Sequence, residues 1–91
     1  MKLIHSPAEG KKWRAVFSDG THTDFGATGY EDYTQHRDEG RREAYRRRHE
    51  KDLASGDPRS AGFLSYFILW GDRASVRANA KTYQRLFGRF L

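Results

Sequence analysis

Hydrophobic and polar residues alternate near the N-terminus, as expected of a strand with one buried face. Between residues 12 and 17, Trp13, Ala15 and Phe17 fall on one side of an extended chain. The turn signal Asp19-Gly20 follows directly, and a second short run of strand-forming residues comes after it. The pattern therefore predicts a β-hairpin.

The register of this hairpin depends on the length of its loop. A three-residue loop over 18–20 places Trp13 opposite Phe25 and Arg14 opposite Asp24, whereas a two-residue loop shifts the pairing. We predict the three-residue loop, because it gathers the aromatic rings on one face of the hairpin.

The residues before the hairpin have no clear period. Pro7 and Gly10 lie within the first ten residues, and both interrupt regular structure. We therefore predict that residues 1–10 form a flexible arm and that residues 11–91 form a single domain.

The long polar segment from Tyr30 to Lys51 has helical spacing but only a thin apolar stripe, and Thr28 is its expected N-cap. Gly40 lowers helix stability by roughly 1 kcal/mol relative to alanine. Two helices, or one bent helix with Asp38 as an internal cap, fit this pattern equally well.

Two further helices are predicted in the C-terminal half. Ser60 can cap a short helix that ends at Gly71, and a strongly amphipathic helix follows residue 75. The expected core consists of large apolar residues from the hairpin and these two helices: Trp13, Phe17, Phe25, Phe63, Phe67, Trp70, Val76, Tyr83 and Phe87. The predicted fold class is α+β, with the N-terminal hairpin packed on three or four helices.

Composition restricts the setting in which this domain acts. The 91 residues contain no cysteine, which excludes a disulfide scaffold and any thiolate metal site and favours the interior of a cell over secretion. The longest apolar stretch, residues 63–70, is far shorter than the ~20 residues of a membrane-spanning helix. Seventeen Lys and Arg against twelve Asp and Glu give a net charge of +5, which favours acidic partners.

Basic residues gather in one segment of the chain. Seven bases and four acids lie between residues 37 and 51, a local net charge of +3. The candidate contact residues for an acidic protein surface or a nucleic acid are Arg37, Arg41, Arg42, Arg46, Arg47, Arg48 and Lys51. A solvated helix with internal ion pairs explains the same pattern without any partner.

No motif indicates catalysis or a bound cofactor. The sequence has no cysteine nucleophile and no serine in a nucleophile-elbow motif, and its four histidines lack the spacing of a metal site. The glycines of the 26–29 loop are explained by a tight bend between strand and helix, because no phosphate-binding signature follows them. We therefore expect no enzyme activity, no cofactor and no metal.

The order of several short motifs resembles a known family. The motifs are Phe25-Gly26-x-x-Gly29-Tyr30-x-Asp32-Tyr33-Thr34-x-His36-x-Asp38, then Arg41, Tyr45-x-x-Arg48-His49, Ala61-Gly62-Phe63 and Leu69-Trp70. Together they resemble a family of small uncharacterised proteins of nucleocytoplasmic large DNA viruses, the giant viruses of algae and amoebae. The resemblance covers roughly residues 11–87 and implies a viral gene product without assigned enzymatic activity, located in the particle or inside the host cell.

The leading functional hypothesis is a non-enzymatic structural or adaptor protein, a minor virion component that contacts other structural proteins of an assembly. Its expected contact surfaces are the arm, the basic helix and the apolar C-terminal residues 86–91. The alternative is a basic nucleic-acid-binding module that uses the arginine-rich helix at 37–51.

Overall fold

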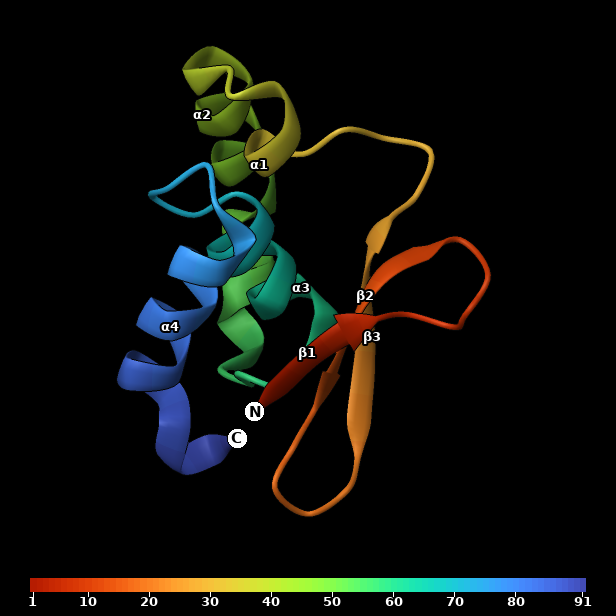
Figure 1. Ribbon diagram of the computed structural model, residues 1–91. Helices are drawn as coiled ribbons and strands as arrows, with labels where there is room; N and C mark the ends of the chain where they lie inside the picture. Colours follow the sequence, from red (N-terminus) through yellow and green to blue (C-terminus); the bar gives the residue numbers. More distant parts are fainter.

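The N-terminal third of the chain folds into a three-stranded antiparallel sheet, which is followed by helices (Figure 1). The structure is a computed structural model that describes residues 1–91. The strands are β1 (Lys2–His5), β2 (Lys11–Val16) and β3 (His22–Ala27), in the order β1-β2-β3. The α+β class is confirmed, with one more strand than predicted.

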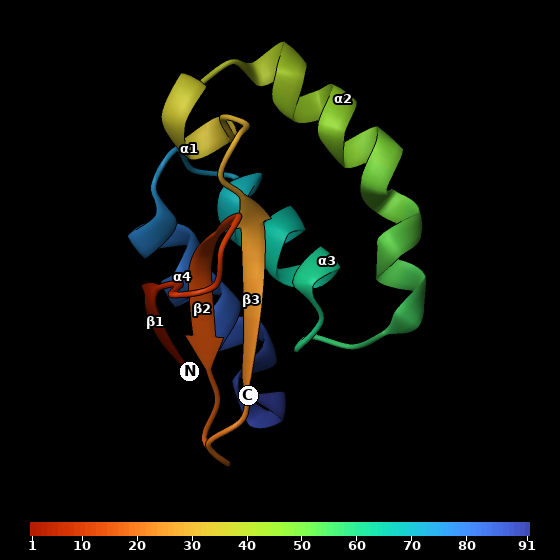
Figure 2. The same ribbon diagram turned by 90° about the vertical axis from the view of Figure 1, so that its right-hand side faces the viewer.

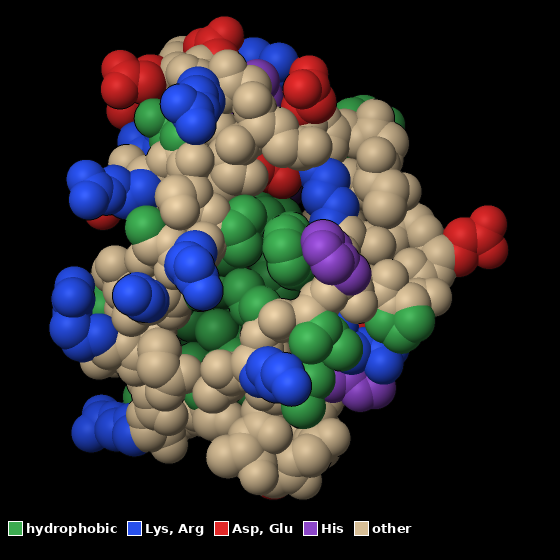
Figure 3. Space-filling model, viewed as in Figure 1, with side chains coloured by type: hydrophobic (Ala, Val, Ile, Leu, Met, Phe, Trp, Pro, Cys, Tyr) green, Lys and Arg blue, Asp and Glu red, His purple; other side chains and the backbone are tan.

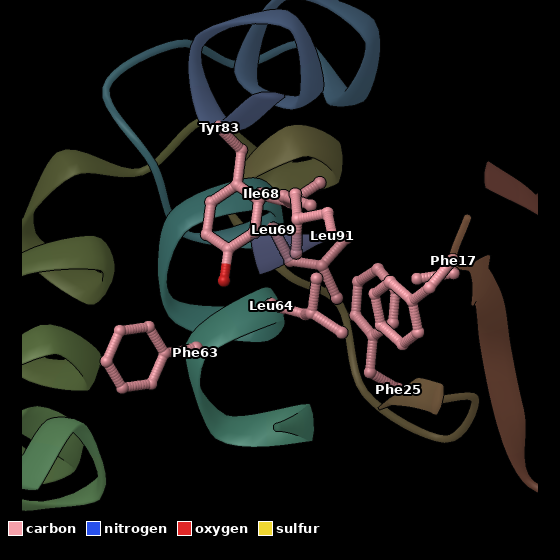
Figure 4. Packing of buried hydrophobic residues seen from close by; sticks show 9 residues of the cluster. Phe17, Phe25, Phe63, Leu64, Ile68, Leu69, Tyr83 and Leu91 are labelled. Atoms are coloured by element: carbon pink, nitrogen blue, oxygen red, sulfur yellow. The ribbon is translucent and has the colours of Figure 1, made fainter. Parts of the chain in front are cut away.

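The hairpin of β2 and β3 has the predicted register. Trp13 pairs with Phe25 and Arg14 with Asp24 across a loop at residues 18–20. Gly20 in this loop has a φ of 86°, a left-handed conformation that glycine adopts without steric cost. The rings of Phe17 and Phe25 consequently lie together on the face that packs against the helices (Figure 4).

The N-terminal residues differ from the predicted arm. Residues 2–5 form β1, which pairs with the free edge of β2 in a register that sets Leu3 opposite Ala15. His5 stacks on Trp13 with ring centroids 4.6 Å apart. An unpaired strand edge offers a row of backbone hydrogen-bonding groups, and the arm is ordered because β2 provides one.

The remaining chain forms four α-helices and three short irregular helices. They are α1 (Tyr33–His36), α2 (Glu39–His49), η1 (Glu50–Ser55), α3 (Ala61–Leu64), η2 (Ser65–Leu69), α4 (Val76–Phe87) and η3 (Gly88–Phe90). None of them combines the length and the apolar character that crossing a membrane requires.

The polar segment forms two helices, which was one of the two predicted alternatives. The break lies at Arg37, whose φ is 58°, and Asp38 caps α2 by accepting a hydrogen bond from the Arg41 amide at 3.1 Å. Gly40 lies in the first turn of α2 and causes no break. Thr28 was the wrong N-cap, because Asp32 begins the first helix through a capping box with Gln35.

The helix that starts at Ser60 is the centre of the core, as predicted. Its second half, η2, is a π-helical turn in which the amide of Trp70 donates to the carbonyl of Ser65 at 3.0 Å. Ile68 and Leu69 on this turn are almost completely buried.

The predicted core was partly correct. Phe17, Phe25, Phe63 and Tyr83 are buried. Phe17 and Phe25 gather with Leu64 between the sheet and the α3–η2 segment, whereas Tyr83 extends from α4 and packs on Phe67 and Phe87 (Figure 4). The other predicted residues are partly buried and pack against this cluster: Trp13, Phe67, Trp70, Val76 and Phe87. The prediction missed seven buried hydrophobic residues: Ala15, Tyr33, Leu64, Tyr66, Ile68, Leu69 and Leu91.

A domain this small covers its core incompletely. Figure 3 shows a central hollow with hydrophobic side chains at its bottom, between the strands and the helices, and basic side chains around it. The sheet and the helices therefore leave part of the core uncovered on this face.

The buried side chain of Asn79 joins α4 to the end of the core helix. Its amide donates to the carbonyl of Ile68 at 2.9 Å and to that of Arg73 at 2.7 Å, and its oxygen accepts from the Arg73 amide at 3.1 Å. A Cβ on Gly71 would collide with the carbonyl of Phe67 and lie 2.9 Å from the Asn79 side chain, so only glycine fits beside this amide.

Replacing Asn79 by alanine should destabilise the fold by about 2–3 kcal/mol, because two carbonyls and one amide lose their partner in a buried site. Urea denaturation measures this change. Lys81→Ala, on the exposed side of the same helix, is the control and should change stability by less than about 0.5 kcal/mol. Equal effects of the two substitutions would contradict the role given to Asn79.

Acid should weaken the sheet through Asp24. Hydrogen bonds from Arg14, at 2.8 and 3.1 Å, and from Ser6, at 2.8 Å, lower the pKa of this carboxyl to about 2. The ordinary value is ~3.9 in an unfolded chain, so the carboxylate contributes stability above about pH 4 and loses it as the pH falls toward 2.

We therefore expect Asp24→Asn to be less stable than the parent protein at pH 7, with a difference that shrinks as the pH falls from about 4 to 2. Urea unfolding at a series of pH values measures it, and Glu9→Gln at an exposed position is the control. A difference that stays constant over this range would contradict the assignment.

Candidate functional site

Helix α2 lies apart from the sheet, and α3 lies between the two (Figure 2). None of its residues is buried, although it is one of the two longest helices of the chain. Burial of an apolar face normally holds a helix in place. The position of α2 therefore depends on polar and aromatic side chains.

Two arginines attach α2 to the end of the core helix. The Nε of Arg42 donates to the carbonyl of Gly71 at 2.6 Å, and its Nη2 donates to Asp72 at 2.8 Å. Arg46 donates from Nη1 to the carbonyl of Trp70 at 2.8 Å, and its guanidinium lies 4.2 Å from the ring centroid of Tyr66. Carbonyls at a helix C-terminus lack helical partners and attract positive charge, which both guanidinium groups supply.

Aromatic rings provide the second attachment. Tyr45 on α2 stacks on Trp70 with centroids 4.1 Å apart and planes 5° apart, and its other face stacks on His49, also at 4.1 Å. Burial raises the pKa of Tyr45 to about 12, so its phenol remains protonated at neutral pH. The stack fixes the face of α2 that is turned toward the core.

Two histidines form local hydrogen bonds. The Nδ1 of His36 accepts a hydrogen bond from the Asp38 amide at 2.9 Å, at the break between α1 and α2. His49 lies 2.9 Å from the carboxylate of Asp52. No group of three or more His, Asp or Glu side chains is arranged to hold a metal ion.

A cleft of about 570 Å³ is lined by residues of α2, of the α3–η2 segment and of β2 and β3. Small and apolar side chains form much of its lining, including Ala44 on α2, Ala61 and Gly62 on α3, and Leu69. A volume of this order accommodates a small ligand or a few residues of a peptide.

The charges around the cleft are unequal. Lys12 is paired with Asp32 at 2.8 Å, whereas Lys11, Arg41 and Arg48 are exposed and form no hydrogen bond or salt bridge through their side chains. Three positive charges are therefore available to a bound group. Chemically the cleft is suited to binding an acidic group next to an apolar one.

The predicted contact residues separate into three groups. Arg41 and Arg48 line the cleft, and Arg37, Arg47 and Lys51 are exposed outside it. Arg42 and Arg46 were predicted to contact a partner. Their guanidinium groups instead make contacts within the chain. The physical reason is the position of these two residues on the side of α2 that meets the carbonyls of η2.

Sequence reasoning missed Lys11, Tyr45 and Trp70 as parts of one site. Lys11 belongs to β2 and Trp70 follows η2, so the fold brings them together from distant parts of the chain. One signal was available, because Arg41, Ala44, Tyr45 and Arg48 recur at helical spacing and must share one face of α2.

Replacing Arg46 by glutamine should destabilise the protein by about 2 kcal/mol, because the charge-assisted bond to Trp70 and the contact with Tyr66 are both weakened. Urea denaturation measures the loss. Arg47→Gln is the matched control, since this neighbour is exposed and has no internal partner, and it should change stability by less than about 0.5 kcal/mol. A loss at Arg47 as large as that at Arg46 would contradict the attachment described above.

Comparison with known proteins identifies a family for this chain. No curated protein and no solved structure matches it. Residues 1–49 match the family of unknown function DUF5754, and these residues comprise the sheet, α1 and α2. Because the match covers more than half of the 91 residues, the chain belongs to this family of unknown function.

Proposed function

We propose that this protein is a non-enzymatic adaptor that joins other proteins of an assembly. The observation that carries the proposal is the cleft beside α2, where the cations Lys11, Arg41 and Arg48 have no partner in the chain and surround an apolar lining. Free charges around an apolar centre are the usual anatomy of a protein-binding surface.

A second surface at the end of α4 supports the same function. Leu86 is 58% exposed and Phe90 is 46% exposed, and both are large apolar side chains. The exposed Arg85 and Arg89 lie beside them in the sequence. An adaptor needs two separate contact surfaces, and the cleft and this C-terminal surface provide them.

The assembly we propose is the particle of a large DNA virus. The resemblance of the motifs between Phe25 and Trp70 to small proteins of such viruses supports this setting. A domain of 91 residues has limited stability of its own and gains stability from whatever it binds, which suits a minor component of a larger structure.

Nucleic-acid binding is the competing function, and the contacts of α2 argue against it. Of the seven bases at 37–51, Arg42 and Arg46 donate to carbonyls within the chain, which leaves five for phosphates. The unpaired carboxylate of Glu31 also lines the cleft, and a backbone that carries a negative charge at every repeat would be repelled by it.

Quantitative mass spectrometry of purified particles tests the proposed location. The protein should be present in a fixed ratio to the major structural proteins and should remain after nuclease treatment. Its absence from nuclease-treated particles would rule out the virion component.

A salt titration tests the competing function. A phosphate-binding protein loses ~10³–10⁵ in affinity between about 50 and 200 mM salt when it makes six to ten phosphate contacts. With five free bases at 37–51, we expect duplex binding with a slope of about 5 or less in a plot of log affinity against log salt. Tight binding with a steep slope, flattened by Arg41→Gln and Arg48→Gln, would favour the nucleic-acid module instead.

A further inference from the structure

The cleft beside α2 has a specific chemical preference that follows from its charges and its size. We propose that it binds a short, extended acidic segment of a partner protein, with two carboxylates placed on either side of an apolar side chain. This inference rests on the proposed adaptor function and names the chemistry of its ligand.

The positive charges define where the carboxylates lie. Arg41 and Arg48 are seven residues apart on α2, a separation of roughly 10.5 Å along the helix axis. Successive side chains of an extended chain point to opposite sides, and the chain rises about 3.3 Å per residue. Acidic residues four positions apart therefore lie on one side, roughly 13 Å apart, within reach of the two long arginine side chains. Both arginines are exposed and unpaired, and each can bind a carboxylate in a bidentate manner.

The lining between the two arginines defines the central side chain. Ala44 lies between them on α2, and Ala61 and Gly62 face the same cleft from α3. Such small side chains leave room for one apolar group, and the half-buried rings of Tyr45 and Trp70 supply apolar surface for it. A carboxylate alone would leave this surface unused.

The wall of the cleft that lies opposite α2 favours a peptide over a more highly charged ligand. Lys11 adds a third free cation there, whereas Glu31 adds an unpaired carboxylate. A peptide with spaced acids and neutral residues between them can place its backbone amides beside Glu31. A polyphosphate carries negative charge at every repeat and cannot avoid this group.

Two variants with the same change in net charge isolate the cleft. The cleft variant carries Lys11→Gln, Arg41→Gln and Arg48→Gln. The control variant carries Arg37→Gln, Arg47→Gln and Lys51→Gln, three exposed positions in and around α2 that do not line the cleft. Both should melt within about 4 °C of the parent protein, because all six side chains are exposed and unpaired.

The experiment selects phage-displayed random 12-residue peptides on the parent protein and measures the enriched peptides by fluorescence anisotropy. We expect peptides with two acids four positions apart and an apolar residue midway between them. Their affinity should fall about tenfold or more for the cleft variant and change less than about twofold for the control variant.

Three results would overturn the inference: enriched peptides without paired acids, equal losses in the two variants, or duplex DNA binding that depends on the cleft cations while acidic peptides fail to bind. The particle measurement remains independent of these results. If the protein is present in particles but its cleft does not bind acidic peptides, the adaptor function stands and the proposed ligand is wrong.

Discussion

The unsatisfied carbonyls at the end of the α3–η2 helix are the constraint around which the other parts are arranged. A helix that ends inside a small domain leaves carbonyl groups that need donors. In this protein the donors come from elsewhere in the chain: Asn79 of α4 for Ile68, and Arg46 and Arg42 of α2 for Trp70 and Gly71. One helix end thereby fixes the positions of two other helices.

The identity of these donors has consequences for the surface. Because α2 is attached by arginines and by the stack of Tyr45 on Trp70, it needs no buried apolar face. It lies apart from β3 (Figure 2). Residues of both elements line the cleft. The remaining arginines of α2 are then free, and two of them, Arg41 and Arg48, line that cleft.

Local chemistry made much of the fold predictable. Loop length and ring pairing gave the hairpin register, and the caps Asp38, Ser60 and Ser75 mark helix starts in the sequence and in the structure. The strand β1 was not predictable from the local pattern, because residues 2–5 form a strand only by pairing with the edge of β2. The burial of Leu69 accompanies the π turn of which it is the last residue, because residues in a π turn depart from ordinary α-helical spacing.

The site was less predictable than the fold. The seven basic residues at 37–51 carry the same charge, so the sequence does not distinguish them. Only the packing of α2 on the core helix shows that the guanidinium groups of Arg42 and Arg46 have internal partners and the others do not. The contribution of Lys11 depends on the distance between β2 and α2, which no local pattern encodes.

The most direct test of this account is the proximity of Tyr45 and Trp70 in solution. Their centroids lie 4.1 Å apart, so proton NMR should give strong nuclear Overhauser effects between the two rings. If the arginines hold α2 in place, these signals should weaken or disappear in the double variant Arg42→Gln/Arg46→Gln while signals between Phe17 and Phe25 persist. Ring contacts that remain unchanged in the double variant would contradict the claim that the arginine–carbonyl bonds position α2.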